Sequence, residues 1–441
     1  PSFADWTSRL PLFSDPIRRG RMFEVFREDG TPTEEPSPLG PDGWPVVDGR
    51  WHGVRLFGGM EGFMPEMLRF DDFMVKLVQN ESVAFLLWKD RPKGDWTPRL
   101  KRGYGSWHMP SLEALKYFQP KVLRTLDWGY QSRKTRRPDW TKPRVKPEDP
   151  LQGEEMALGL HWEAPNLLKC MLWWNAPPRF ELSVAEYEAR LEEMLIVIKW
   201  NTSYTPMLQY GNELWNEGFP VHKWLKDGAG TGWTPTGFTW HTAAVHEIKI
   251  LKGVADRVFG DAGPLGQKPY YLFVDGHIGN PDTLDRILSA LPFPRHAAGP
   301  AVYAQPLKED QSIWRNDASS LSQESLCLSV MENMAQFRLK LDAHRNILKA
   351  HNVPFFACYE VGQDMHAKGE AYKKAALQAQ REPWMGDVYR ELRSMLQAAG
   401  VNLACWYSAA SAQTLDRSFG LLESTLDKAT PLPKAVAARG E

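Results

Sequence analysis

The sequence predicts an α/β protein, a (β/α)8 TIM barrel that carries a small inserted β-rich module near its N-terminus. Three observations support this prediction. From residue 122 onward, short apolar runs alternate with helical stretches, as in parallel strands joined by right-handed crossovers. The apolar runs end in polar or aromatic residues, as strands do at the functional end of such a barrel. The chain of 441 residues is long enough for a barrel with insertions.

The predicted barrel strands are eight apolar runs. They begin at Leu10, Val122, Leu167, Met207, Tyr270, Gly299, Pro354 and Val401, and the first of them is short and weak. Apolar residues at steps of three and four predict the helices between them, most clearly in Val184–Trp200 and His241–Phe259. A long helix is predicted near Leu321–His351. An open doubly wound sheet is the alternative, but no GxGxxG or Walker-type loop follows the early strands.

The predicted domain organisation has three parts. Residues 1–30 are the first barrel unit, with an extended piece at Leu10–Phe13 and a helix near Pro16–Phe26. Residues 31–104 are the inserted module, where a segment rich in Pro and Gly is followed by three partly alternating runs. These runs, WHGVRLFGG, MLRFDDFMVKLV and SVAFLLWKD, predict short strands. Residues 105–441 form the remainder of the barrel.

Composition and charge exclude several classes of partner. The chain has 53 Lys and Arg against 54 Asp and Glu, so its net charge of −1 gives no attraction to nucleic acid or to anionic membranes. No run approaches the roughly 18 apolar residues that are needed to span a bilayer, so no membrane insertion is expected. The 4 cysteines show no CxxC spacing and are expected to be small buried hydrophobic residues.

Neither a leader nor a metal site is predicted. The first residues, PSFADWTSRL, have no basic segment and no apolar core, so we expect no signal peptide in this chain. The location stays open between cytoplasmic synthesis, with later release or virion association, and a secreted form whose leader was cleaved. Among His222, His241, His246 and His277 there is no HExxH motif, and the second and third do not share a helix face. We therefore expect no metal and no cofactor.

Two glutamates follow apolar runs of the predicted barrel. Asn212-Glu213 follows Met207–Tyr210, and Glu360 follows Pro354–Tyr359. Since the carboxyl ends of barrel strands meet on one face, the two carboxyl groups are expected to face each other. Paired carboxylates are the usual equipment for cleaving a glycosidic bond. Either residue alone could be a solvated loop residue, and Glu217, one helical turn further on, competes with Glu213.

These motifs resemble those of clan A glycoside hydrolases. In that clan strand four ends in Asn-Glu, whose Glu is the acid/base, and strand seven ends in the nucleophile. Here Glu213 ends the fourth predicted strand and Glu360 ends the seventh. More narrowly, residues 105–410 look like a group of bacterial and phage proteins with a Tyr-Ser-Asn-Glu-Val-Trp-Asn motif. The chain departs from that motif at Gly211 and Leu214, and neither change removes a carboxylate.

The resemblance implies a retaining mechanism with two glutamates. Glu213 would protonate the leaving oxygen, Glu360 would attack the anomeric carbon, and Asn212 would hold the sugar 2-hydroxyl group. Tyr303 would donate a hydrogen bond to the nucleophile, and Trp406 would be the stacking floor of the subsite. Aromatic rings stack on the apolar faces of sugars. Further substrate contacts are predicted at strand ends and in the following loops, at Asp127, Trp128, Trp174, Asn175 and Trp215.

The predicted function is therefore a retaining glycoside hydrolase that cleaves O-glycosidic bonds of a polysaccharide or oligosaccharide. The alternative is a catalytically silent carbohydrate-binding or structural protein on the same barrel, for instance a virion component. A transglycosylase would use the same residues. The basic loop Arg133–Lys146 is expected to be a solvated face, or else to attract an acidic polysaccharide. Homo-oligomer formation and virion assembly stay open.

Overall fold

The protein is described by a computed structural model of the 441-residue chain. It describes residues 115–126, 158–180, 182–227, 239–260, 270–317, 319–365, 370–409, 418–422 and 432–440, and the backbone of four strands before them. The strands are β1 (Phe23–Phe26), β2 (Gly53–Phe57), β3 (Phe73–Val75), β4 (Val83–Trp88), β5 (Val122–Arg124), β6 (Met171–Ala176), β7 (Met207–Tyr210), β8 (Tyr271–Gly276), β9 (Ala297–Pro300), β10 (Val302–Ala304), β11 (Phe355–Gln363) and β12 (Leu403–Trp406). The helices are α3 (Leu158–Leu168), α4 (Val184–Asn201), α5 (Pro220–Lys226), α6 (Trp240–Phe259), α7 (Pro281–Ala290), α8 (Lys308–Asn316), α9 (Gln323–Ala350), α10 (Glu370–Ala379), α11 (Pro383–Ala398) and α12 (Pro433–Arg439).

The larger sheet is a nearly closed parallel barrel. Strands β5, β6, β7, β8 and β9 pair in that order, and β11 pairs with β9, β10 and β12, all in parallel. Strands β9 and β10 flank Ala301 and together form one interrupted strand. The two edge strands, β5 and β12, approach each other with Cα atoms within 8 Å. This arrangement confirms the predicted (β/α)8 TIM barrel, from its second strand to its eighth.

The first predicted strand, Leu10–Phe13, lies outside the described residues. The other seven occur in the predicted order, with ends displaced by a few residues. The largest displacement is at the third strand, where Leu167 and Leu168 still belong to α3 and the strand begins at Met171. An apolar run that continues from a helix into a strand carries no marker for the boundary, because both elements bury it.

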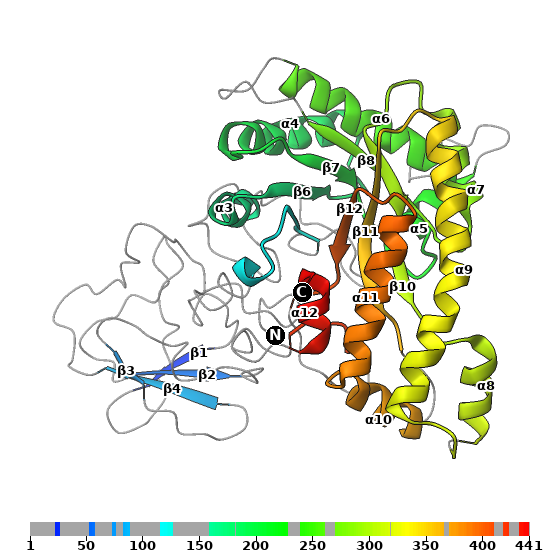
Figure 1. The fold of residues 1–441 in the computed structure, drawn as a ribbon. Helices are drawn as coiled ribbons and strands as arrows, with labels where there is room; N and C mark the ends of the chain where they lie inside the picture. Colours follow the sequence, from blue (N-terminus) through cyan, green and yellow to red (C-terminus); the bar gives the residue numbers. More distant parts are fainter. Residues whose placement is uncertain are drawn as a thin grey trace.

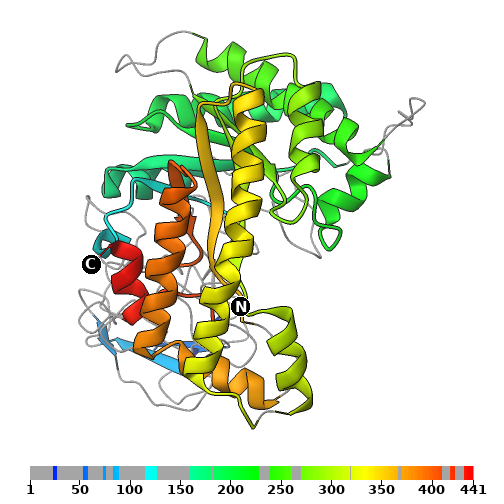
Figure 2. The same ribbon diagram turned by 45° about the vertical axis from the view of Figure 1, so that its right-hand side comes forward.

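The helices surround the outside of the curved sheet (Figures 1 and 2). Helix α4 shows why the periodicity predicted them, since Tyr187, Leu191, Leu195 and Ile198 form one buried stripe. Its start is fixed by a capping box, in which the Ser183 side chain accepts from the backbone N–H of residue 186 and the Glu186 side chain accepts from the backbone N–H of residue 183. The predicted helices at 184–200, 241–259 and 321–351 are confirmed.

Alternation along the strands divides the core into an outer and an inner part. The outer core lies between sheet and helices and includes Trp174 and Leu208. The inner core fills the barrel and includes Trp173, Met207 and Phe273. Because successive side chains of a strand point to opposite faces, each strand contributes to both parts. The inner core therefore lies directly beneath the carboxyl ends of the strands, where the candidate site is found.

Strand β11 contains a β-bulge. Three residue steps separate Cys358 from Val361, but their partners in β12 are only two steps apart. The pairing of β11 with β9 and β10 shows the same offset. One extra residue is thus accommodated next to Glu360. Tyr359 belongs to the inner core, and Glu360 also reaches the interior, where it meets Arg124. A bulge lets two successive side chains share a face in this way.

The segments before the barrel form a second sheet. It is antiparallel, with the strand order β1-β2-β4-β3. The three strands predicted in the inserted module correspond to β2, β3 and β4. The helix predicted near Pro16–Phe26 is wrong at its end, because Phe23–Phe26 is β1 and pairs with β2. The residues of β1, Phe, Glu, Val and Phe, suit a strand, and the pairing of β1 with β2 overrides the helical spacing of the apolar residues before it. The three domain boundaries stay predictions.

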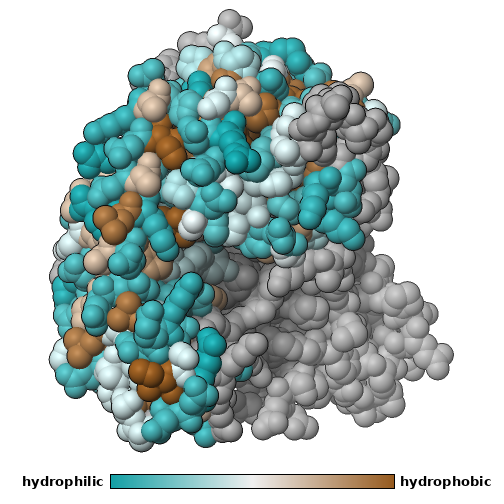
Figure 3. Space-filling view, turned by 90° about the vertical axis from the view of Figure 1, so that its right-hand side faces the viewer, coloured by the Kyte–Doolittle hydropathy of each residue, from teal (hydrophilic) through white to brown (hydrophobic). Residues whose placement is uncertain are grey.

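Two further findings concern helices and surface. The short helix α5 begins two residues after Gly218, and the short helix α12 lies near the C-terminal end of the described residues. The face on the side of α7, α8 and α9 is largely hydrophilic, with hydrophobic residues in separate spots (Figure 3). No helix in the part of the chain that the structure describes is long and apolar enough to span a bilayer.

Candidate active site

Glu213 lies on a tight turn at the carboxyl end of β7. Gly211 has a φ of 58° and Glu213 a φ of 47°, both in the left-handed region. Glycine adopts this region freely, but a glutamate does so only when its surroundings hold it there. The Glu213 side chain is 8% exposed, whereas the competing Glu217 is exposed on the surface. Burial therefore favours Glu213 over Glu217 as the functional carboxyl group.

Buried side chains from three other elements hold this turn. Asn175 of β6 donates from Nδ2 to the carbonyl oxygen of Gly211 at 2.7 Å. Asp275 of β8 accepts the backbone N–H of Leu214 at 3.1 Å. His222 of α5 bonds through Nδ1 to the carbonyl oxygen of Leu214 at 2.7 Å. The turn is thus fixed from three sides, so the position of the Glu213 carboxyl group is set by the fold.

Glu360 is held by two donors within the barrel. Arg124 of β5 donates to its Oε1 at 2.8 Å, and the Tyr303 hydroxyl group donates to its Oε2 at 2.7 Å. The hydrogen bond expected for Tyr303 is therefore present. Glu360 was predicted at the end of its strand, but β11 continues to Gln363. The bulge gives it access to the interior from within the strand.

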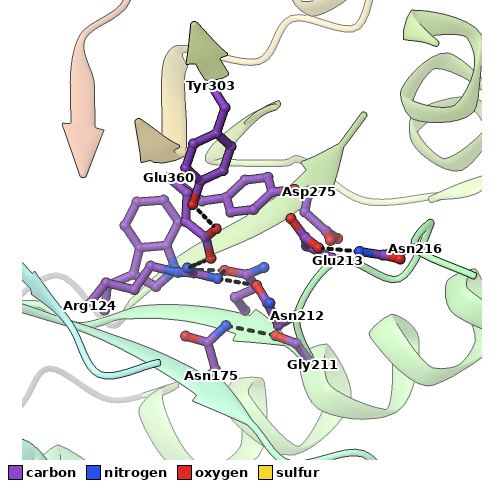
Figure 4. A network of polar contacts seen from close by, with 12 residues as sticks. Arg124, Asn175, Gly211, Asn212, Glu213, Asn216, Asp275, Tyr303 and Glu360 are labelled. Carbon is purple, nitrogen blue, oxygen red and sulfur yellow. Dashed lines mark hydrogen bonds and ion pairs between the residues drawn. The ribbon is translucent and has the colours of Figure 1, made fainter. Parts of the chain in front are cut away.

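Arg124 connects both parts of the site. Besides Glu360, it donates to Oδ1 of Asn212 at 2.6 Å and to Oε1 of Gln209 at 3.2 Å. Its guanidinium group lies near the faces of the Trp173 and Tyr359 rings, at 5.6 and 5.0 Å from their centroids. Its side chain is only 5% exposed. A buried, planar donor of this kind fixes the positions of its acceptors relative to one another (Figure 4).

The electrostatic environments of the two glutamates differ. Burial raises the pKa of Glu213 to about 8, and the charges of Glu360 and Asp275 add to the rise. The amide of Asn216, which donates to Glu213 Oε2 at 2.7 Å, and the charge of Arg124 act in the opposite direction. Glu360 instead forms an ion pair with Arg124 and accepts a hydrogen bond from the Tyr303 hydroxyl group. Such a difference suits one acid and one carboxylate.

Aromatic residues surround the carboxyl groups. Trp215 contacts His277 in a tilted arrangement with ring centroids 4.1 Å apart, and its indole N–H donates to the Tyr359 hydroxyl group at 3.0 Å. On the other side, Tyr407 and Phe419 lie 6.1 and 5.8 Å from the Tyr303 ring. The site therefore has a flat aromatic residue beside Glu213 and an aromatic cluster beside Glu360.

Two predicted substrate contacts do not lie in the site. Trp174 is 1% exposed in the outer core, because its neighbour Trp173 takes the interior position of β6. Trp406 packs on Tyr389 of α11, with ring centroids 5.4 Å apart, and Cys405 faces the inner core instead. Both errors have one cause. Successive side chains of a strand point to opposite faces of the sheet, but this alternation does not tell which of two neighbours faces inward.

The remaining predicted residues divide as follows. Asn212, Tyr303 and Trp215 are brought to the site. Asn175 is fully buried and positions the turn. Asp127 and Trp128 lie outside the described residues.

Several functional residues were missed by the sequence analysis. Asp275 follows an apolar run, so the signal that identified Glu213 could also have identified it. For Arg124 the signal was a basic residue within an apolar strand, and for Gln209 a polar one. In the parts of the chain that the structure describes, no group of three or more His, Cys, Asp or Glu side chains could hold a metal ion.

The chain is similar to several solved structures. One is a family 51 α-L-arabinofuranosidase from Bifidobacterium longum, with 12% identity and a TM-score of 0.46, over 71% of this chain and 63% of that chain. Another is a GH5-4 broad-specificity endoglucanase from an uncultured bacterium, with 13% identity and a TM-score of 0.41, over 75% and 84%. A third is an endo-β-1,4-mannanase from Thermotoga petrophila, with 12% identity and a TM-score of 0.42, over 74% and 71%.

No family model and no curated protein matches the chain. The resemblance to bacterial and phage proteins therefore stays a prediction. Since the TM-scores above lie below 0.5, those likenesses decide neither the fold nor the activity. The fold follows from the pairing of the strands, and the function proposed below follows from the geometry of the site.

Proposed function

We propose that the protein is a retaining glycoside hydrolase with Glu213 as the acid/base and Glu360 as the nucleophile. The observation that carries the proposal is the difference between the two buried carboxyl groups. The raised pKa of Glu213, about 8, keeps a proton on this group at neutral pH. Arg124 forms an ion pair with Glu360, and the Tyr303 hydroxyl group donates a hydrogen bond to it. One acid and one carboxylate at the same end of a barrel are what double displacement requires.

In the first step Glu213 gives its proton to the glycosidic oxygen while the bond from that oxygen to the anomeric carbon breaks. An oxygen of Glu360 attacks the anomeric carbon and forms a glycosyl ester, and the leaving group departs as an alcohol. The ester carries no charge, so the repulsion between Glu360 and Glu213 disappears. The pKa of Glu213 then falls, because the charge of Glu360 is one cause of its rise.

In the second step Glu213, now a carboxylate, takes a proton from a water molecule. The water oxygen attacks the anomeric carbon and releases the Glu360 carboxylate, which restores both groups to their initial states. Two inversions at the same carbon give net retention of configuration. Asn212 contributes to both steps, since Arg124 binds its amide oxygen and its NH₂ group is available to a sugar hydroxyl group.

The aromatic residues support a carbohydrate substrate, which we propose to be a polysaccharide or oligosaccharide. Trp215 lies two residues after the acid/base and would contact the leaving-group side. The half-buried Tyr407 and Phe419 adjoin Tyr303, so they would contact the sugar that Glu360 attacks. Tyr407 thus takes the stacking position that was predicted for Trp406. Each ring offers an apolar face to a sugar ring.

The test is to incubate the purified chain with a panel of glycans and to measure the release of reducing ends. In Glu360→Gln we expect turnover to be abolished while oligosaccharide binding persists. In Glu213→Gln we expect kcat to fall by roughly 10²–10⁴-fold, and by less on substrates whose leaving group needs no proton. Glu217→Gln is the matched control and should keep full activity.

The configuration of the first product tests the mechanism separately. Proton NMR of an early reaction should show the anomer with the configuration of the substrate. An inverted product would exclude double displacement but keep the hydrolase. Transfer of the glycosyl group to an added sugar in place of water would identify a transglycosylase. Binding of a glycan without release of any product, by the wild-type chain, would favour the silent carbohydrate-binding protein.

A further inference from the structure

Asp275 is a third buried carboxyl group in the candidate site. It follows the apolar run of β8, is 3% exposed, and lies beside Glu213 (Figure 4). Strand β8 pairs with β7, the strand that leads into the Glu213 turn. So far the Asp275 carboxyl group has been described only as one of the three supports of that turn.

The first role of Asp275 is geometric. Its Oδ2 accepts the backbone N–H of Leu214 at 3.1 Å, one residue after the glutamate whose φ is 47°. A left-handed residue other than glycine is strained and persists only where neighbouring contacts determine it. The hydrogen bond from the Leu214 N–H to this buried carboxylate is such a contact.

The second role is electrostatic. Burial raises the pKa of Asp275 to about 6, while the N–H groups of the turn and the charge of Arg124 act against the rise. Asp275 is therefore ionised at neutral pH, and its negative charge makes ionisation of Glu213 harder. The titratable groups that act on Glu213 come from four strands and are Arg124, Asp275, Tyr303, Tyr359 and Glu360. Glu360 is esterified in the intermediate of the proposed reaction, but Asp275 forms no bond to the sugar.

We propose that Asp275 is a positioning residue that holds the left-handed Glu213 turn and places a fixed negative charge beside the Glu213 carboxyl group. The inference rests on the proposed function, because it assigns Glu213 the role of the acid. Asp275 would affect the reaction only through its effect on Glu213. This role also accounts for a buried carboxylate on a strand that contributes neither glutamate.

Two substitutions separate the two roles. Asp275→Asn removes the charge and keeps an oxygen that can accept from Leu214. Asp275→Ala removes both the charge and the acceptor. Asp282→Asn is the matched control, since it is the same chemical change at an exposed position in α7, the helix that follows β8. Chemical denaturation of each variant establishes that it is folded before it is compared.

The decisive measurement is the titration of Glu213 itself. Glutamate labelled with ¹³C at the side-chain carboxyl group gives a signal that is assigned by its loss in Glu213→Gln. In Asp275→Asn we expect the midpoint of this titration to move to lower pH by on the order of half a pH unit. In Asp282→Asn the midpoint should stay at the wild-type value. A midpoint that does not move in Asp275→Asn overturns the electrostatic role.

Kinetics test the geometric role. In Asp275→Ala we expect kcat to fall by about 10²-fold with little change in KM, because a displaced acid impairs the chemical step more than binding. In Asp275→Asn we expect kcat near the pH optimum to stay within a few-fold of wild type. The alkaline limb of the pH profile should shift to lower pH. Equal kcat in wild type and Asp275→Ala overturns the geometric role.

The two proposals fail in different ways. If the wild-type chain releases no product from any glycan, the proposed hydrolase function fails, while the NMR titration still decides whether Asp275 controls the protonation of Glu213. If the wild-type chain is active and the titration midpoint of Glu213 is the same in Asp275→Asn, the hydrolase function stands and the electrostatic role of Asp275 fails.

Discussion

At the scale of the residue, the site depends on different surroundings for identical side chains. Glu213 is buried and receives one neutral donor, the Asn216 amide. Glu360 receives a guanidinium group and a hydroxyl group. Burial raises the pKa of Glu213, whereas Glu360 lies in an ion pair. The proposed division of roles rests on these contacts and needs no difference in side-chain chemistry.

The raised pKa of Glu213 predicts a pH dependence of stability. The folded state binds this proton up to about pH 8, whereas the unfolded chain loses it near pH 4.5. The stability that Glu213 contributes by binding this proton is thus fully present below about pH 4.5, and it is lost progressively as the pH rises to about 8. Glu213→Gln cannot lose a proton, so the variant should gain in unfolding free energy relative to wild type as the pH rises from 5 to 9.

Urea unfolding at several pH values measures this difference. The change should exceed about 1.4 kcal/mol, which corresponds to a tenfold change in proton affinity. Glu217→Gln, the same substitution at an exposed site, should show no such trend. A difference between Glu213→Gln and wild type that is constant with pH would contradict the pKa of about 8.

Residue types at strand ends predicted only part of this site. Glu213, Glu360, Asn212 and Tyr303 were found because a polar residue after an apolar run is conspicuous, and the resemblance supplied their roles. Arg124 was missed because a single basic residue in a short strand has no distinctive spacing. Its importance comes from Glu360, whose position in the chain is remote, and only the folded barrel brings them together.

At the scale of the element, the β-bulge in β11 decides where Glu360 points. Without the extra residue, alternation would place Tyr359 and Glu360 on opposite faces of the sheet. With it, both reach the interior, and the strand pairs again with β10 and β12 beyond the bulge. Bulges next to active sites commonly redirect a side chain in this way. The sequence contains no glycine at residues 358–361 that would have marked it.

Close packing of β9 against β11 predicts a severe effect at Gly299. A Cβ atom at this position would clash with the carbonyl oxygen of Ala357, which is backbone and cannot rotate away. Gly299→Ala should therefore lower the free energy of unfolding by about 1–3 kcal/mol or more. The matched control is Gly253→Ala in α6, where an added Cβ meets nothing within 4 Å.

In that control we expect a gain of up to about 1 kcal/mol, because alanine favours a helix over glycine. Thermal and urea unfolding of both variants provide the measurement. Equal stability of Gly299→Ala and wild type would mean that β9 and β11 can separate without loss, contrary to the pairing of β11 with β9 before this point and with β10 after it.

The elements were predictable in type but not in orientation. Helices with a full apolar stripe, such as α4 and α6, were found almost to the residue. The short helix α5 was missed because its seven residues are too few to show a period. The faces of strands β6 and β12 were assigned wrongly, since two adjacent tryptophans or a Cys-Trp pair give no sign of which residue faces inward.

At the scale of the whole molecule, helix α12 is linked to β11, the strand that contains Glu360. Lys434 of α12 is fully buried and donates to Gln380, the residue directly after α10, at 2.6 Å and to the carbonyl oxygen of Ser418 at 3.1 Å. Gln363, the last residue of β11, donates to the same two acceptors. One buried network thus links four segments that are remote in the sequence.

This network predicts that Lys434→Met destabilises the protein although the site lies elsewhere. The change leaves Gln380 and Ser418 with fewer donors, and we expect a loss of about 1–3 kcal/mol in unfolding free energy. Urea unfolding measures it. Lys349→Met, at an exposed position near the end of α9, is the control and should stay within about 0.5 kcal/mol of wild type. Equal losses in both variants would contradict the role of the network.

The order of the strands was the most reliable part of the whole-molecule prediction. Alternation of strands and helices from residue 122 gave the barrel, and each of the seven later strands lies where the order required. Contacts across the barrel could not be predicted in the same way. Lys434 and Arg124 each join segments that neither neighbour in sequence nor pair as strands, and no local pattern records such contacts.

The carboxyl groups of Asp275 and Glu360 lie near one guanidinium group, that of Arg124, while Glu213 carries a proton at neutral pH. In the proposed reaction a sugar ring gains positive charge as its bond breaks, and this excess of carboxylates would stabilise that charge. The same excess should make iminosugars, whose ring nitrogen is protonated, bind more tightly than neutral sugars of equal shape.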